Sequence, residues 1–167
     1  MKGGIFLKIA IAGFKGSNNS AKIFIDKFSL FNDKIYLQNN KNISVEQMIL
    51  SLNQYDYIFA FGQKPLIKNK ICIEICGQYE NMCLVTTYPI NDIMHFFNGK
   101  YNIKLSQNPG TSYCNNLYFN ALKYIKENNL NTKMLFIHVP MLKNISDIDV
   151  LIAYFESYIT TSELFTE

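Results

Sequence analysis

A cysteine and a histidine, each in an unusual local sequence, are the residues of this chain best suited to chemistry. Cys114 stands within Gly-Thr-Ser-Tyr-Cys-Asn at residues 110–115, and His138 within Phe-Ile-His-Val-Pro at residues 136–140. A thiolate is a strong nucleophile, and a neighbouring imidazole takes up the thiol proton and later protonates a leaving amine. The pair therefore indicates nucleophilic thiol chemistry, provided that the fold brings the two side chains together.

The elements around the pair predict how it is positioned. Cys114 opens an expected helix over 114–128, and His138 lies near the end of an expected strand over 133–139. In a βαβ unit the helix begins where one strand ends, and the next strand returns to that same edge. A helix of about 15 residues covers ~22 Å and a strand of about seven covers ~23 Å, so both side chains should reach one edge. The helix N-terminus should also lower the thiol pKa and offer N–H groups to an oxyanion.

Both motifs resemble those of the type I pyroglutamyl peptidases, cysteine peptidases that remove an N-terminal pyroglutamyl residue. The nucleophile stretch of that family looks like Ala-Gly-Thr-x-x-Cys-Asn-x-x-aromatic, which residues 109–118 match apart from Pro109 at the first position. Its histidine stretch, Phe-Ile-His-Val/Ile-Pro, is matched by residues 136–140. Two motifs in the same order are more specific than either alone. The resemblance implies Cys114 as nucleophile and His138 as general base and acid, without a metal ion or another cofactor.

The third member of the family's triad is a glutamate that follows a Gly-Gln pair and lies within Ile-x-x-Glu. Gly62-Gln63 and then Ile-Cys-Ile-Glu at residues 71–74 place Glu74 at that position. Residues 71–76 are also expected to form a buried strand, in which a carboxylate is costly unless a partner pairs with it. An imidazolium at the adjacent strand end would be such a partner. Glu80 is the alternative acid if the strand ends earlier.

Substrate recognition departs from the family pattern more than the chemistry does. The family's N-terminal loop looks like Gly-Phe-x-Pro-Phe-Gly-Gly, and this chain keeps the first phenylalanine as Phe14 but lacks the second. The resemblance also implies Gln63 as a ligand of the pyrrolidone ring. After Gly62-Gln63 the family continues Ala-Gly-Gly-Arg, whereas residues 64–67 here are Lys-Pro-Leu-Ile. A long loop between the glutamate and the cysteine is missing, because Glu74 and Cys114 are only 40 positions apart.

Three functions remain in competition. The first is hydrolysis of peptides that begin with pyroglutamate. The second is a catalytically silent relative that binds a peptide or a protein, which the altered pocket suggests. The third is another Cys-His-Glu hydrolase, such as a glutamine amidotransferase-like amidase, which is disfavoured because Gly-x-Cys-x-Gly and His-Pro-Glu are both missing.

Composition narrows the range of partners. The 167 residues, 49% of them hydrophobic, predict a single domain over 1–167, and the resemblance implies that it is an α/β peptidase-like domain. All 16 basic residues are lysines, which excludes Cys-x5-Arg phosphatases and arginine-finger phosphoryl transfer. The net charge of +3 is spread along the chain, so nucleic-acid binding is not expected. Whether the protein forms a homo-oligomer is left open.

No segment predicts a membrane span or a secretory signal. The apolar run over 5–14 is short and contains Lys8, and a first buried strand explains it better. A cytoplasmic location is therefore expected, in which all four cysteines stay thiols. Cys72, Cys76 and Cys83 are expected to be buried and inert, and Cys114 to alkylate faster than they do.

Alternating strands and helices predict an α/β fold with three layers, α/β/α, around a mixed, largely parallel central sheet. Boundary signals include possible capping boxes that begin at Ser44 and Ser146, a polar turn over 39–42, and Pro89 before a first helical turn. The expected strands are 7–12, 34–37, 57–61, 71–76, 101–105 and 133–139, and the expected helices are 20–31, 45–53, 90–98, 114–128 and 148–159.

Overall fold

A computed structural model describes residues 7–30, 33–107, 110 and 112–165 of the protein. The strands are β1 (Ile9–Phe14), β2 (Lys34–Leu37), β3 (Tyr57–Lys64), β4 (Lys70–Glu74), β5 (Cys76–Tyr79), β6 (Met82–Val85), β7 (Asn102–Ser106) and β8 (Lys133–Pro140). The helices are α1 (Ser20–Lys27), α2 (Lys41–Leu52), α3 (Ile90–Phe97), α4 (Tyr113–Glu127) and α5 (Ile148–Thr161), with a short 3₁₀ helix η1 (Leu142–Asn144). None of the helices in the described ranges combines the length and the apolar character that crossing a membrane would require.

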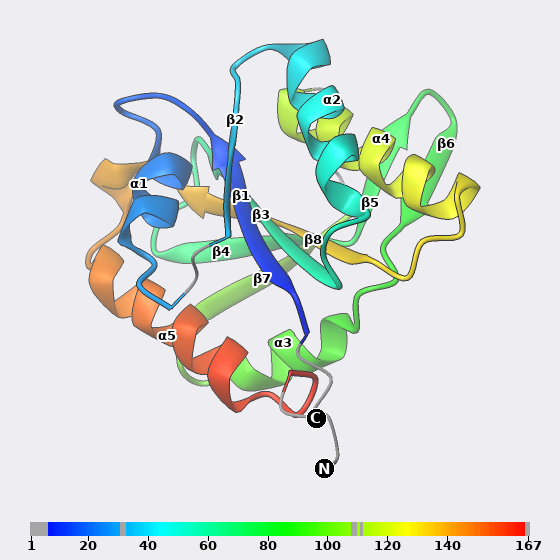
Figure 1. Ribbon diagram of the computed structural model, residues 1–167. Coiled ribbons are helices and arrows are strands. Elements are labelled where there is room, and N and C mark those ends of the chain that lie inside the picture. The colour runs from blue at the N-terminus through cyan, green and yellow to red at the C-terminus, as the bar shows by residue number, and fades with distance from the viewer. Residues whose placement is uncertain (1–6, 31–32, 108–109, 111, 166–167) are drawn as a thin grey trace.

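Within the described residues, six strands form one sheet in the order β2-β1-β3-β8-β4-β7 (Figure 1). β2, β1, β3 and β8 run parallel to one another, and β7 runs parallel to β4. The β4–β8 pair is antiparallel, so β8 joins two parallel blocks of opposite direction. The predicted α/β fold with a mixed, largely parallel sheet is confirmed.

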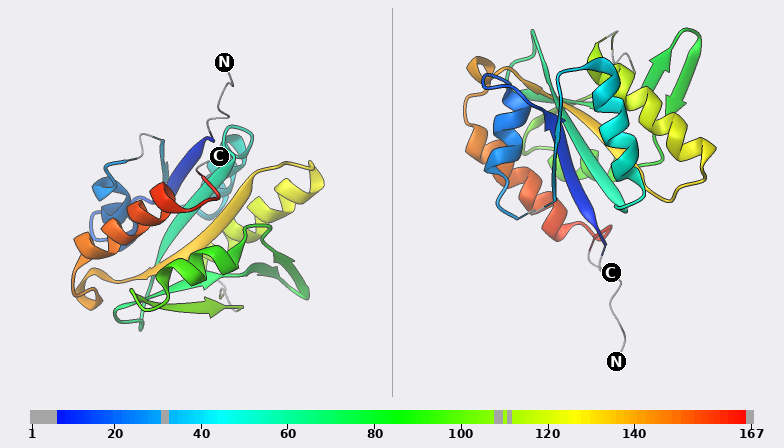
Figure 2. Two further views of the ribbon diagram at one scale, coloured as in Figure 1. Left: turned by 90° about the horizontal axis from the view of Figure 1, so that it is seen from below. Right: turned by 45° about the horizontal axis from the view of Figure 1, so that its top comes forward.

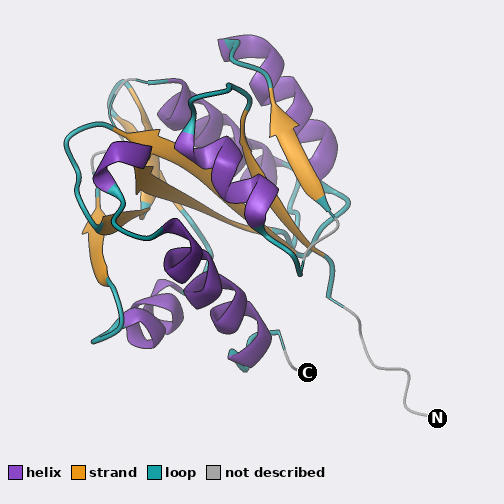
Figure 3. Cartoon of the chain, turned by 90° about the vertical axis from the view of Figure 1, so that its left-hand side faces the viewer, coloured by secondary structure: helices purple, strands orange, loops and turns teal. Residues whose placement is uncertain are grey.

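Helices cover both faces of this sheet, which gives the three layers seen in Figures 2 and 3. On one face α1, α3 and α5 pack through a core that includes Phe24, Phe97 and Phe155. On the other face α2 and α4 pack through a second core that includes Met48 and Leu117. The sheet therefore separates two apolar cores, as strands buried on both faces require.

The chain leaves the sheet after Glu74 and forms a hairpin that the sequence analysis did not predict. β5 pairs antiparallel with β6, so the strand expected over 71–76 ends at Glu74. The hairpin is fastened to α4, because the Asn115 side chain accepts from Gln78 N and donates to Gln78 O, each at 2.8 Å. A Cβ at Gly77 would lie 2.5 Å from the backbone nitrogen of Phe119, so only glycine allows this close approach. Strands of four residues are too short for a clear period-two pattern.

Two helices begin at residues other than the serines that were expected to cap them. α2 begins at Lys41 with Asn40 as its N-cap. The Asn40 side chain accepts hydrogen bonds from the backbone nitrogens of Asn42 and Ile43, at 3.0 Å each. The polar turn expected over 39–42 is therefore the start of a helix, and Ser44 is buried inside it. α5 is capped by Asp147 rather than by Ser146. The side-chain oxygens of asparagine and aspartate cap helices as well as serine does, which makes neighbouring candidates hard to separate.

Candidate active site

Three neighbouring strands bring predicted site residues to one face of the sheet. Gly62 of β3 lies opposite His138 of β8, and in the next pair Glu74 of β4 lies opposite Phe136 of β8. Side chains alternate between the two faces along a strand, so directly opposite residues and residues two apart share a face. Because Phe136 belongs to the core beneath α2 and α4, His138 and Glu74 lie on that same face.

His138 and Glu74 form a buried imidazole–carboxylate pair. Nδ1 of His138 lies 2.6 Å from Oε1 of Glu74, and the two residues are only 3% and 0% exposed. The contact occupies one ring nitrogen and leaves Nε2 for another partner. The hydroxyl of Tyr118 on α4 donates to the backbone oxygen of Glu74 at 3.1 Å, which fixes the end of β4 beneath that helix.

The Glu74 carboxyl remains charged despite its burial. Burial opposes ionisation, but hydrogen bonds from His138 and Ser106 outweigh it, with help from the charges of His138 and Lys64, so the pKa of Glu74 lies below its usual value. Nζ of Lys64 lies 3.3 Å from Oε1, the same oxygen that contacts His138. A charged carboxylate in this place orients the imidazole and stabilises an imidazolium.

Cys114 is the second residue of α4, which begins after the N-cap Ser112. Its sulfur lies over Gly62, because a Cβ added to that glycine would lie 2.7 Å from Sγ. Gly62 is the direct sheet neighbour of His138. The thiol therefore lies above the strand position beside the imidazole, and the absence of a side chain at Gly62 provides the space for it.

The pKa of the Cys114 thiol lies above its usual value, so the expectation of a lowered pKa is wrong. Burial raises the pKa of Cys114 to about 11, and the negative charge of Glu74 adds to the rise. Hydrogen bonds from Ser112 and from the Cys114 backbone, together with the charge of Lys64, act in the opposite direction without compensating. Formation of a thiolate therefore requires a base that takes the proton.

A pocket of about 330 Å³ opens beside Cys114 and includes both predicted substrate residues, Phe14 and Gln63. Phe14 is only 4% exposed, and it belongs to the core beneath α2 and α4 as well as to the pocket wall. Oε1 of Gln63 accepts from the backbone nitrogen of Ser20 at 3.1 Å. The amide nitrogen of Gln63 is therefore the end of that side chain left to pair with a ligand.

Several residues of this region were not predicted as site residues. Asn19, Asn39 and Tyr113 also line the pocket, and Lys64 contacts the carboxylate. Asn19 caps α1, since its side chain accepts from the backbone nitrogen of Ala21 at 2.9 Å. A search for helix caps would have placed Asn19 at a strand-to-helix turn, whereas nothing in the local sequence marks Asn39 or Lys64.

Other candidate residues lie elsewhere. Glu80, the alternative acid, is exposed at the turn between β5 and β6, and Glu74 is the acid that contacts His138. Cys72 and Cys76 are buried, but Cys83 is exposed, contrary to expectation. Pro109 and Thr111 of the nucleophile motif lie outside the described residues.

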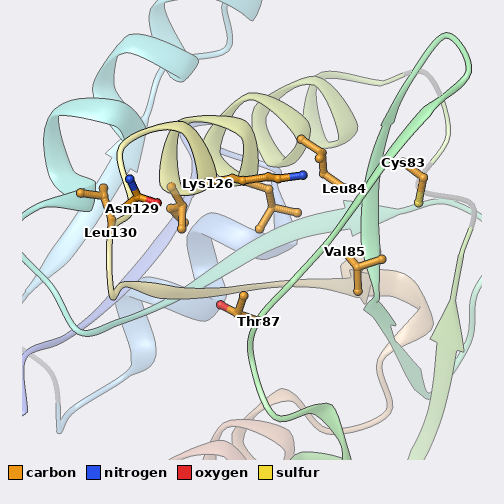
Figure 4. A pocket seen from close by; sticks show the side chains of 9 residues that line it. Cys83, Leu84, Val85, Thr87, Lys126, Asn129 and Leu130 are labelled. Atoms are coloured by element: carbon orange, nitrogen blue, oxygen red, sulfur yellow. The ribbon is translucent and has the colours of Figure 1, made fainter.

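A larger pocket of about 630 Å³ lies away from these residues, between α4 and β6 (Figure 4). Cys83 and Val85 of the hairpin and Lys126 near the end of α4 are among its lining residues. Its described lining contains no histidine and no carboxylate. The described lining of the smaller pocket contains neither as well, but its Cys114 thiol lies over Gly62, the sheet neighbour of His138, which contacts Glu74. The smaller pocket at Cys114 is therefore the candidate site.

The described residues contain no cluster of three or more histidine, cysteine, aspartate or glutamate side chains suited to a metal ion.

Comparison with curated proteins finds relatives of one kind. The chain is 35% identical over 103 residues to pyrrolidone-carboxylate peptidase 2 of Caldanaerobacter subterraneus subsp. tengcongensis, a match that covers 60% of this chain and 47% of that protein. It is 33% identical over 103 residues to the pyrrolidone-carboxylate peptidase of a Thermoanaerobacter species, with the same coverage. The matched part thus spans about half the length of these relatives. No protein-family model matches the chain.

Solved structures of pyrrolidone carboxyl peptidases and pyroglutamyl peptidases have a similar fold. The pyrrolidone carboxyl peptidase from Thermococcus litoralis superposes with a TM-score of 0.73 at 16% identity, over 93% of each chain. The pyroglutamyl peptidase I from Bacillus amyloliquefaciens superposes with a TM-score of 0.77 at 14% identity, over 95% of each chain. The predicted resemblance is confirmed in sequence over 60% of the chain, and in fold over nearly all of it.

Proposed function

We propose that this protein is a cysteine peptidase that removes pyroglutamate from the N-terminus of peptides. One observation carries the proposal: the sulfur of Cys114 lies over Gly62, the sheet neighbour of His138, and His138 contacts the buried carboxylate of Glu74. The similarity to pyrrolidone-carboxylate peptidases supports the choice of substrate.

In the first step the thiol of Cys114 attacks the carbonyl carbon of the pyroglutamyl residue. Because burial raises the pKa of Cys114 to about 11, Nε2 of His138 takes the thiol proton as the bond forms, rather than beforehand. Glu74 holds the ring through Nδ1 and stabilises the imidazolium. Free backbone N–H groups in the first turn of α4 are suited to the developing oxyanion.

In the second step the imidazolium gives its proton to the leaving amine, and a thioester between Cys114 and pyroglutamate remains. Water then attacks the thioester while His138 takes its proton. The imidazolium returns that proton to the sulfur, which releases pyroglutamate and regenerates the thiol. The base and acid roles alternate on one ring, as in other nucleophile–histidine hydrolases.

The pocket offers groups that match a lactam ring. A pyroglutamyl ring presents one N–H donor and one carbonyl acceptor. The amide nitrogen of Gln63 is suited to the carbonyl, since its oxygen is already bound to Ser20, and Asn19 and Asn39 add amide groups to the same wall. Phe14 supplies an apolar surface for the ring. A prolyl residue lacks the lactam carbonyl and would leave a buried donor unpaired, which costs binding energy.

A fluorogenic pyroglutamyl amide tests the proposal, with the matching prolyl amide as the control substrate. We expect turnover of the first in clear preference to the second, and loss of turnover in Cys114→Ala. Wild-type turnover equal to that of Cys114→Ala at high enzyme concentration would contradict the assignment.

The second candidate is a catalytically silent relative that binds a peptide. The divergent residues beside the pocket favour it, since Lys-Pro-Leu-Ile at 64–67 stands where the family pattern has Ala-Gly-Gly-Arg. A complex of one pyroglutamyl peptide per chain, formed without turnover and measured by calorimetry, would support this alternative.

A further inference from the structure

We propose that Lys64 is a positioning residue of this site, whose ammonium group shares the Glu74 carboxylate with His138 and sets the pH range in which the site is active. The inference rests on the proposed function and deepens it. Lys64 directly follows Gly62-Gln63, where the pattern of the type I pyroglutamyl peptidases has alanine.

The geometry joins three side chains at one oxygen atom. Oε1 of Glu74 lies 2.6 Å from Nδ1 of His138 and 3.3 Å from Nζ of Lys64. The Lys64 side chain is 31% exposed, whereas that of Glu74 is 0% exposed. The carboxylate is therefore held between a buried imidazole and a lysine that reaches solvent.

The backbone places Lys64 for this contact. It is the last residue of β3, the strand that also carries Gly62 beneath the thiol of Cys114. One strand end therefore supplies both the space for the sulfur and the cation for the carboxylate. Gly62 beneath the nucleophile and Lys64 beside the acid are thus two residues apart on one strand, so the backbone of β3 holds them at a fixed separation.

Several titratable groups around the pair come from β4, β5 and α4, and burial raises the pKa of each one: Cys72, Cys76, Cys114 and Tyr118. From β7 comes the hydroxyl of Ser106, which is not charged. Lys70 of β4 and Lys104 of β7 lie on the same face, and the charge of each lowers the pKa of Cys72. Of the described lysines, Lys64 is the one that forms an ion pair with Glu74.

The sign of the effect follows from Coulomb's law. A cation beside a carboxylate favours its charged form, and the charge of Lys64 lowers the pKa of Glu74. Burial raises the pKa of Cys114, and the charge of Lys64 offsets part of that rise. Removing the charge should therefore move deprotonation of the Cys114 thiol to higher pH. At this distance and partial exposure we expect a shift of about 0.5–1 pH unit.

The test compares Lys64→Met with the wild type in kcat/KM for the pyroglutamyl amide, between about pH 5 and 9 at low ionic strength. We expect the acid limb of Lys64→Met to move up by about 0.5–1 pH unit, which lowers the rate about 3- to 10-fold on that limb and changes it little on the plateau. Lys64→Arg should restore the wild-type profile. Exposed Lys68, in the loop that follows β3, provides the matched control Lys68→Met, which changes net charge equally and should leave the profile in place.

Two further readouts do not depend on turnover. The chain has two histidines, so the ring signals in a magnetic resonance titration can be assigned with a His95→Gln variant. The His138 ring signals should change in Lys64→Met and not in Lys68→Met. The pH profile of Cys114 alkylation by iodoacetamide, mapped by mass spectrometry to separate it from exposed Cys83, should move to higher pH in Lys64→Met.

Each outcome bears on a different statement. A shift in the titration and alkylation profiles without any peptide turnover would uphold the role of Lys64 and refute the proposed peptidase. Turnover with coincident wild-type and Lys64→Met profiles would overturn the role of Lys64 and leave the peptidase standing. A shift of equal size in Lys68→Met would reduce the effect to net charge and would also overturn it.

Discussion

β3 presents side chains of very different size to the two faces of the central sheet. On the face covered by α1, α3 and α5, the ring of Phe61 lies 4.9 Å from that of Phe24 and 5.4 Å from that of Phe155, measured between centroids. On the face covered by α2 and α4, the neighbouring positions of the same strand are Ala60 and Gly62. One strand therefore alternates between large aromatic and very small residues.

This difference separates stability from chemistry. Each buried aromatic ring removes a large apolar area from water and contributes to the free energy of unfolding. Small residues contribute little, but they let the first turn of α4 approach the strand, which brings the sulfur of Cys114 onto Gly62. Substitutions on one face should thus change stability, and those on the other should change turnover.

The largest effect on turnover is expected from the nucleophile and its base. Cys114→Ala and His138→Ala should each lower kcat roughly 10³-fold or more, and the double variant scarcely further, since residues that act as one unit are not additive. Denaturant unfolding should show no large loss of stability for Cys114→Ala. Losses that multiply in the double variant would contradict a shared proton transfer between the two residues.

The next largest loss of turnover is expected at Glu74, whose contribution to stability also depends on pH. Glu74→Gln should lower turnover less than Cys114→Ala, because a poorly oriented imidazole still acts as a base, and Glu80→Gln should change it little. The pKa of Glu74 in the folded protein lies below its usual value. The charged pair therefore contributes its full stabilisation above about pH 4.3, the ordinary pKa of glutamate in the unfolded chain. This contribution is lost as the pH falls through the lower pKa of the folded state. Unfolding free energies of wild type and Glu74→Gln should therefore converge on acidification. A gap that widens instead would exclude this role of the pair.

A smaller loss is expected at the glycine beneath the thiol. The added methyl group of Gly62→Ala would lie 2.7 Å from Sγ of Cys114 and 3.0 Å from the ring of Phe136, so the sulfur must move. A displacement of about 1 Å costs roughly 10²-fold in rate. Steady-state kinetics should show the loss in kcat. Gly99→Ala, at a helix end with no atom of a non-adjacent residue within 4 Å of the added methyl group, is the control: it should change stability and leave kcat unchanged. Full activity in Gly62→Ala would show that catalysis does not require the Cys114 sulfur to lie over residue 62.

The smallest effect on turnover is expected on the aromatic face. Phe155→Ala should cost ~3–5 kcal/mol of stability, because the ring is fully buried among Phe24, Phe61 and Phe97. The folded fraction should keep kcat within about twofold, since no residue of the pocket is touched. Denaturant unfolding and kinetics measured on the same sample decide this, with Phe155→Leu as a milder variant. A large loss of kcat in fully folded protein would break the separation between the faces.

The sequence predicted the order of the main elements because their signals are local. The helix that carries Cys114 and the strand that carries His138 each begin within one residue of the expected position. The hairpin of β5 and β6 was missed because it is held by a tertiary contact, the Asn115 side chain on Gln78. The contact of Lys64 with Glu74 and the raised pKa of Cys114 were missed for a similar reason, since burial and charge at a site are properties of the whole fold.

The position of β8 constrains how the chain reaches this structure. β8 lies between β3 and β4, and in the strand order it is the only connection between the β2-β1-β3 block and the β4-β7 block of the described sheet. Its partner residues in β3 lie far earlier in the chain, as in the pairing of Tyr57 with Lys133. Contacts at such separation form slowly, because a long loop must close before they contribute energy. We therefore expect the two blocks to form with the edges at β3 and β4 still unpaired, and β8 then to join the sheet and complete the imidazole–carboxylate pair in one late step.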